Sequence, residues 1–282
     1  MLRHTFCHIP GIGLKAETKL WARGINCWDD ALRMSLTDAS SYRSVLLKTR
    51  VLESRNSLEN YDSTYFAESL PSGELWRLFG DFQDSVAYLD IETCPTRRSA
   101  NGITTVSMYD GKKIYHYIRG QNLEEFAADI QRYKVVVTYN GKLFDVPVLE
   151  KSLKIRMDQA HIDLRHLLKS LGYTGGLKGC EKKLGIDRCE LDGVNGYFAV
   201  LLWYDYRKTN NRKALDTLLA YNTLDAVNLH RLMVMAYNLK LQQTPFYDEH
   251  RLEIPEPVPN PFEADIETLE RIRERIHFAH SS

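Results

Sequence analysis

The sequence predicts an α/β fold, with a mixed sheet that helices cover on both faces. Two runs, at 86–92 (VAYLDIE) and 134–140 (KVVVTYN), are largely apolar and end in polar residues. Such runs are typical of strands buried on both faces. Between them, residues 103–120 (ITTVSMYDGKKIYHYIRG) indicate a hairpin, because an Asp-Gly turn joins two β-rich segments. Hairpin strands are antiparallel, so the sheet is mixed.

The other elements follow in chain order. Residues 1–80 read as helical and polar, and end in a turn and a short helix at 69–80. Residues 122–133 (NLEEFAADIQRY) predict a helix with Asn122 as its cap and acids in its first turn. Residues 160–172 predict a short strand that runs into a helix, which Gly172 can end. The chain then reads as helical to about residue 241.

The final segment predicts a linker and a docked helix. Residues 253–262 (EIPEPVPNPF) are rich in proline, as semi-rigid linkers are. After them, four apolar residues recur at helical spacing and predict a buried face: Ile266, Leu269, Ile272 and Ile276. We therefore expect a helical N-terminal region at 1–80, an α/β domain at 81–245, and a linker with a C-terminal helix at 246–282.

Composition narrows the class of protein. The 282 residues are 44% hydrophobic and 26% charged, and 37 basic residues balance 37 acidic ones. A neutral chain is not a basic coat protein, although a local basic groove remains possible. No run approaches the roughly 20 apolar residues of a membrane span, and the N-terminus has no apolar signal core. The five cysteines form no CxxC pair, which favours reduced thiols and a cytoplasmic protein.

Acidic residues gather where the predicted strands end. Asp90 and Glu92 are two apart on a strand, so both point to one face. Asp145 lies in the first turn of the helix that follows the second buried strand. Tyr221 and Asp225 are four apart on a long helix and share one of its faces. Because ligand crevices form at strand ends in α/β sheets, these groups are expected to converge.

Four convergent carboxylates repel one another unless cations lie between them. Mg²⁺ and Mn²⁺ prefer carboxylate and water oxygens, so two such ions are the expected cofactors. Two ions about 3.5–4 Å apart are the usual arrangement for in-line attack on a phosphate. Tyr221 would orient the attacking water, since an ordinary tyrosine pKa near 10 makes it a poor base at neutral pH.

The segments DIET (90–93), YNGKLFD (139–145) and YNTLD (221–225) resemble the three motifs of the tyrosine branch of the DEDD 3′–5′ exonucleases. With the run GGLKGCEKKLGI (175–186), they are similar to the YprB-like exonuclease family. The resemblance covers roughly 85–240 and implies a ribonuclease-H-like fold with a five-stranded mixed sheet. It implies that Asp90, Glu92, Asp145 and Asp225 are metal ligands and that Tyr221 orients water. Asn140 would support the second motif, and Thr93 would lie near the terminal nucleotide.

A second resemblance lies near the N-terminus. The turn PGIG at 10–13 opens a helix, and this segment is similar to a helix-hairpin-helix element. Gly11 and Gly13 would then let the backbone approach a DNA phosphate, and Lys15 would add charge. The first helix of the hairpin is short, and a plain glycine turn before a helix is the alternative. Four lysines are candidates for a rim that holds phosphates, although a solvated charged face explains them nearly as well: Lys142, Lys178, Lys182 and Lys183.

Together these features predict a metal-dependent 3′–5′ exonuclease whose partner is a nucleic acid, with DNA favoured. An exoribonuclease is the alternative with the same chemistry. Two other classes stay open: a ribonuclease-H-type endonuclease, and a module that binds nucleic acid without cleaving it. The sequence indicates neither a membrane nor a protein partner.

Overall fold

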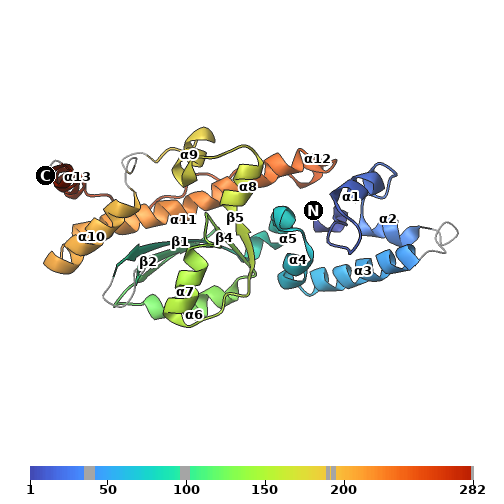
Figure 1. Cartoon of the computed structure of the whole chain (residues 1–282), viewed down its shortest axis with the longest axis horizontal. Coiled ribbons are helices and arrows are strands. Elements are labelled where there is room, and N and C mark those ends of the chain that lie inside the picture. Colours follow the sequence, from blue (N-terminus) through green and yellow to red (C-terminus); the bar gives the residue numbers. More distant parts are fainter. Residues whose placement is uncertain (35–41, 96–101, 189–190, 192–194, 281–282) are drawn as a thin grey trace.

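The computed structural model describes residues 1–34, 42–95, 102–188, 191 and 195–280. A five-stranded sheet with the order β3-β2-β1-β4-β5 forms its centre (Figure 1). The central strand β1 pairs antiparallel with β2 and parallel with β4. The strands are β1 (Val86–Cys94), β2 (Gly102–Tyr109), β3 (Ile114–Ile118), β4 (Val135–Thr138) and β5 (Ala160–Asp163). This mixed sheet with flanking helices confirms the predicted α/β class.

Helices cover both faces of the sheet. The 30-residue helix α11 (Arg212–Leu241) crosses one face, and α6 (Phe126–Asp129) and α7 (Asp145–Leu153) lie on the other (Figure 1). Alternation along β1 explains this division. Val86 and Tyr88 join the core that includes α11, whereas Leu89 and Ile91 join the core with α6 and α7. Four further helices complete this part: α8 (Leu164–Ser170), α9 (Gly176–Lys183), α10 (Gly196–Thr209) and α12 (Tyr247–His250).

The N-terminal region lies at the end of the molecule opposite α10 (Figure 1). Its elements are η1 (Leu2–His4), α1 (Leu14–Trp21), α2 (Trp28–Arg33), α3 (Tyr42–Glu59), α4 (Ser63–Ser69), η3 (Ser72–Leu78), α5 (Phe79–Phe82) and η4 (Gln83–Ser85). Its buried residues, among them Phe6 and Phe66, belong to the same core as Val86 and Met233. The division of the chain near residues 80 and 245 stays a prediction.

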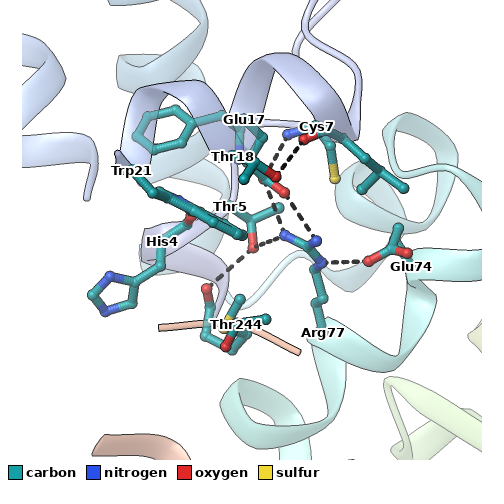
Figure 2. Close-up of polar contacts among 12 residues, drawn as sticks. His4, Thr5, Cys7, Glu17, Thr18, Trp21, Glu74, Arg77 and Thr244 are labelled. Atoms are coloured by element: carbon teal, nitrogen blue, oxygen red, sulfur yellow. Dashed lines mark hydrogen bonds and ion pairs between the residues drawn. The ribbon is translucent and has the colours of Figure 1, made fainter. Parts of the chain in front are cut away.

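A buried ion network joins α1 to η3 (Figure 2). The Arg77 guanidinium lies 2.9 Å from the Glu17 carboxylate and 2.7 Å from Glu74. Glu17 also accepts hydrogen bonds from the amides of Phe6 and Cys7, at 2.6 and 3.0 Å. The network therefore fixes the N-terminal turn and α1 to the segment that leads into β1.

Two expectations about helices were wrong. The segment at 122–133 is not one capped helix but a succession of short turns, with η5 (Leu123–Glu125) and η6 (Ile130–Arg132) on either side of α6. The Asn122 side chain does not cap α6, because it accepts from the Ile118 amide and donates to the His116 carbonyl, both at 2.9 Å. Its bonds to the end of β3 take the place of the predicted cap.

The C-terminal helix α13 (Ile266–His280) docks on α10 as expected, but through part of the predicted face. Leu269 and Ile272 are buried in a core with Leu202. Ile266, by contrast, is 53% exposed at the start of the helix, and the side chain of Ile276 lies outside the described residues. Among the described residues, no helix is both long and apolar enough to cross a membrane.

Candidate active site

The first acidic pair lies near the end of β1, on the face toward α11. Glu92 is buried and Asp90 is half-buried, while Ile91 between them belongs to the core on the opposite face. The register with β2 shifts between Glu92 and Thr93. Such a bulge is common where a strand must redirect its side chains beside a functional site. The Thr104 hydroxyl donates to the Glu92 carbonyl at 2.9 Å and holds the strand at this point.

The loop from β4 to α7 presents the next acid. Asp163, at the end of β5, accepts hydrogen bonds from the backbone amides of Asn140 and Lys142, at 2.8 and 3.2 Å. Its role in the structure is thus to hold this loop. Only glycine fits at position 141, because a Cβ there would lie 2.3 Å from the Thr138 hydroxyl oxygen. Asp145 is the first residue of α7 and is buried.

Helix α11 provides the remaining two predicted residues. Tyr221 and Asp225 are both 5% exposed and lie one helical turn apart on the face toward β1. Between them, Asn222 donates to Asp90 Oδ2 at 2.6 Å and to the Asp90 carbonyl at 3.2 Å. The Ser107 hydroxyl donates to the Asn222 side-chain oxygen at 2.9 Å. This chain of bonds fixes the Asp90 carboxylate to both α11 and β2.

The fold brings these groups into one cavity. Carboxylate oxygens of Asp90, Glu92 and Asp225 all lie within 4.8 Å of one another. Asp145 and Tyr221 line the same cavity, whose volume is about 740 Å³. That volume lies within the range of small-molecule sites. The oxygen-only donor set fits a hard divalent ion such as Mg²⁺ or Mn²⁺.

Burial and mutual repulsion oppose ionisation of these acids. Burial first, and the Asp225 charge second, raise the pKa of both Asp90 and Glu92 well above the ordinary values. Burial also raises the pKa of Asp145 to about 7, against hydrogen bonds from backbone amides that lower it. The pKa of Tyr221 is raised as well, by burial and then by the Asp225 charge. Bound cations would reverse the shifts of the carboxylates.

Two basic side chains border the acids. Arg188 forms ion pairs with Asp225 and, at 2.7 Å, with Glu181, which also accepts from Asn228. The Lys178 ammonium lies 4.9 Å from the centre of the Tyr221 ring, and its buried nitrogen has no hydrogen-bond partner within the described part of the chain. Sequence reasoning missed Asn222 and Arg188. An asparagine among the apolar residues of a long helix was a usable signal for Asn222. Nothing in the sequence near Arg188 distinguishes it.

The predicted substrate-binding residues do not all lie at this cavity. Asn140 lines it, and its side-chain oxygen accepts a hydrogen bond from Arg165. Thr93 is not among the lining residues, and Lys142 lines a separate cavity of about 310 Å³ with residues of η3 and α8. Gly11, Gly13 and Lys15 are exposed around the start of α1, in the N-terminal region.

Comparison with known proteins identifies the superfamily to which the chain belongs. The family model described as "RNase_H superfamily" matches residues 87–237, which include every acid of the cavity. The chain therefore belongs to the RNase_H superfamily. A search of curated proteins found no match.

Among solved structures, the chain is similar to the family B DNA polymerase from the hyperthermophilic archaeon Pyrobaculum calidifontis, with 16% identity and a TM-score of 0.35. The alignment covers 63% of this chain and 31% of the polymerase, so the chain spans less than a third of that protein.

Proposed function

We propose that this chain is a metal-dependent 3′–5′ exonuclease that acts on nucleic acid, with DNA as the favoured substrate. The observation that carries the proposal is the convergence of Asp90, Glu92 and Asp225 within 4.8 Å, in a cavity that also contains Asp145 and Tyr221. Membership of the RNase_H superfamily supports nuclease chemistry in general. The exonuclease activity and its direction rest on the resemblance of the three motifs to the DEDD family.

In this proposal the four carboxylates hold two divalent ions. When bound, the ions supply an activated water and stabilise the leaving oxygen. Asn222 keeps the Asp90 carboxylate in place through its 2.6 Å hydrogen bond. Arg188 holds Asp225 from the side that faces Glu181.

Tyr221 orients the water and does not deprotonate it. Burial and the nearby carboxylates raise its pKa, so its hydroxyl stays protonated at neutral pH. A protonated phenol can donate to, or accept from, a water at the attacking position. Lys178 lies over the Tyr221 ring and near the charges of Asp225 and Glu92, where it would offer a cation to the substrate phosphate.

We propose that the N-terminal region binds the phosphates of the same nucleic acid at a second place, distant from the cavity. Gly11 has a φ of +84° and Gly13 caps α1, so the exposed turn presents backbone amides beside Lys15. Such contacts bind phosphates without reading sequence, as an exonuclease requires. This part of the proposal rests on the resemblance to a helix-hairpin-helix element.

The test is degradation of 5′-labelled DNA and RNA oligonucleotides, single-stranded and duplex, with Mg²⁺, Mn²⁺ or EDTA. A ladder that shortens from the 3′ end, needs metal and disappears in Asp225→Ala supports the proposal. Asp216→Ala is the matched control, because this acid lies on the same helix but pairs with Arg212 at the surface. Internal cuts would indicate an endonuclease, and binding without cleavage would indicate a binding module; either result contradicts the proposal.

A further inference from the structure

Two histidines and a glutamate meet where the N-terminal turn contacts α12, outside the acidic cavity. His4 belongs to η1, and Glu249 and His250 belong to α12. Each offers one ligand atom, and these atoms lie within 4.8 Å of one another. His4 Nε2 is 3.3 Å from Glu249 Oε1, and His250 Nε2 is 3.5 Å from the same oxygen. Residues separated by 245 positions thus place two imidazoles around one carboxylate.

The His4 ring is held in the orientation that a metal ligand needs. Its Nδ1 lies 2.9 Å from the Asn26 carbonyl oxygen. A carbonyl only accepts, so Nδ1 donates to Asn26, and Nε2 faces Glu249, to which it donates while no ion is bound; an ion between them would displace the Nε2 proton. Metal-binding histidines characteristically donate their second ring nitrogen to a carbonyl in this way. In Figure 2 the ring points away from Arg77, while the His4 carbonyl accepts from Trp21 at 2.9 Å.

His250 supplies an independent observation. Its Nε2 is buried and, among the residues that the structure describes, has no hydrogen-bond partner, although it lies 3.5 Å from Glu249 Oε1. A buried polar atom without a partner is costly and calls for an explanation. A cation between His250 and Glu249 would give this nitrogen a partner.

The distances fit a small borderline cation. Zn²⁺ with ligands at about 2.0–2.2 Å in tetrahedral geometry has ligand-to-ligand separations of about 3.3–3.6 Å. The two distances to Glu249 Oε1, 3.3 and 3.5 Å, fall in this range. Imidazole with one carboxylate favours Zn²⁺ or Co²⁺ over Mg²⁺. The Glu249 side chain is 59% exposed, so an ion can enter and water can complete its coordination.

We propose that His4, Glu249 and His250 bind one Zn²⁺ ion, separate from the acidic cavity. The ion ties the N-terminal turn to α12, which follows directly on the long helix α11. It is a structural site that fixes the N-terminal region against the rest of the fold, whatever nucleic acid the chain acts on. The amino group of Met1 is also close to His250, and Asp81 neutralises it at a distance of 3.1 Å.

The test measures Zn²⁺ binding by equilibrium dialysis and Co²⁺ binding by visible absorption, on the full chain without a histidine tag. An Asp225→Asn background and saturating Mg²⁺ suppress Zn²⁺ binding in the acidic cavity. A failure of the proposed zinc site is therefore distinguishable from a failure of the proposed nuclease. The test variants are Glu249→Gln, which is exposed and keeps the side-chain shape, and His250→Ala. His166→Ala is the matched control, since His166 is exposed on α8, outside the cluster.

In the Asp225→Asn protein, here the parent, and in its His166→Ala variant, we expect one Zn²⁺ per chain and the absorption bands of bound Co²⁺. In Glu249→Gln the Zn²⁺ affinity should fall at least about tenfold, and the bands should weaken or disappear in both test variants. Added Zn²⁺ should raise the melting temperature of the parent but not that of Glu249→Gln. Equal Zn²⁺ affinity in the parent and Glu249→Gln, or no binding by the parent, would overturn the proposal.

Discussion

At the scale of single residues, the site depends on one asparagine that bonds to a carboxylate on another element. Asn222 is fully buried and uses its amide to hold Asp90, while its oxygen accepts from Ser107. A carboxylate that repels its neighbours adopts a fixed position only if a partner of this kind holds it. The placement of Asp90 is therefore a property of the contact between α11 and β1.

In the proposed nuclease reaction, Asn222→Ala should lower kcat by about ten- to a hundredfold, because an unsupported Asp90 would coordinate the proposed metal less well. It should also lower the free energy of unfolding by about 1–3 kcal/mol, since Ser107 loses its acceptor. Activity as a function of Mg²⁺ concentration, together with urea denaturation, measures both effects. Asn238→Ala is the control, because Asn238 lies on the same helix and bonds to the Leu252 backbone instead. Equal activity in wild type and Asn222→Ala would contradict this role.

A second prediction at this scale concerns pH. The pKa of Asp145 rises from 3.8 to about 7 on folding, so between these values the folded protein keeps a proton that the unfolded chain has lost. The free energy of unfolding must then fall with rising pH over this window. In EDTA, Asp145→Asn should gain stability relative to wild type from pH 4 to 7, by on the order of 1 kcal/mol or more.

Melting temperatures of the two proteins at several pH values measure this difference. Because the Asp145 charge also raises the pKa of Asp90 and Glu92, the difference between the two curves measures Asp145 together with its effect on these neighbours. A constant difference across the window would show that the acid is not perturbed.

At the scale of elements, the loop between β4 and α7 has little freedom. Asp163 holds two of its amides, and Thr138 accepts the Gly141 amide at 3.1 Å. Asn140 adopts a φ of +67°, which asparagine tolerates better than most residues. The loop therefore places Asn140 at the cavity and starts α7 with Asp145 pointing into it.

Gly141→Ala should displace this loop, because its Cβ would overlap Thr138. We expect a loss of about 1–3 kcal/mol in the free energy of unfolding and at least about a tenfold loss of kcat. Gly73→Ala is the control, since that position has open space and lies outside the cavity. Thermal denaturation and initial rates test both variants. Unchanged kcat in Gly141→Ala would show that the loop does not position the acids.

At the same scale, two predictions based on local sequence signals were confirmed, whereas two that depended on tertiary contacts were wrong. The Asp-Gly hairpin and the strand at 160–163 formed as predicted, because turn chemistry and apolar runs act over a few residues. Asn122 failed as a helix cap because the end of β3 offered it two bonds. Ile266 failed as a core residue because the first buried apolar residue of the helix is Leu269, while the start of the helix contacts α11 through polar groups.

At the scale of the whole molecule, the Arg77 network connects the N-terminal turn and α1 to η3, the segment of the N-terminal region that leads into β1. Arg77 is 3% exposed and has Glu17 and Glu74 as partners. Removing one member of a buried ion pair leaves a charge without compensation. Removing Glu17 would also leave the Phe6 and Cys7 amides without their acceptor.

Arg77→Ala should therefore lower the free energy of unfolding by about 3–5 kcal/mol, as measured by urea denaturation. The control is Arg50→Ala, whose ion pair with Glu53 lies at the surface and contributes about 0–1 kcal/mol. A loss below about 1 kcal/mol in Arg77→Ala would mean that the network contributes little to holding α1 against η3.

The sequence by itself determined the α/β class and the mixed sheet, since these depend on periodicity and turn residues, and it named the four acids and Tyr221 that the fold brings to one cavity. Only the tertiary structure decided which groups surround them. Arg188 reaches Asp225 from the segment after α9, and Asn222 bonds to Asp90 across the contact between α11 and β1; no local pattern encodes contacts between residues so far apart in the sequence. The same holds for His4 and His250, which are neighbours only because the N-terminal turn packs against α12. Local interactions select elements, whereas side-chain partners across elements exist only once the chain has packed.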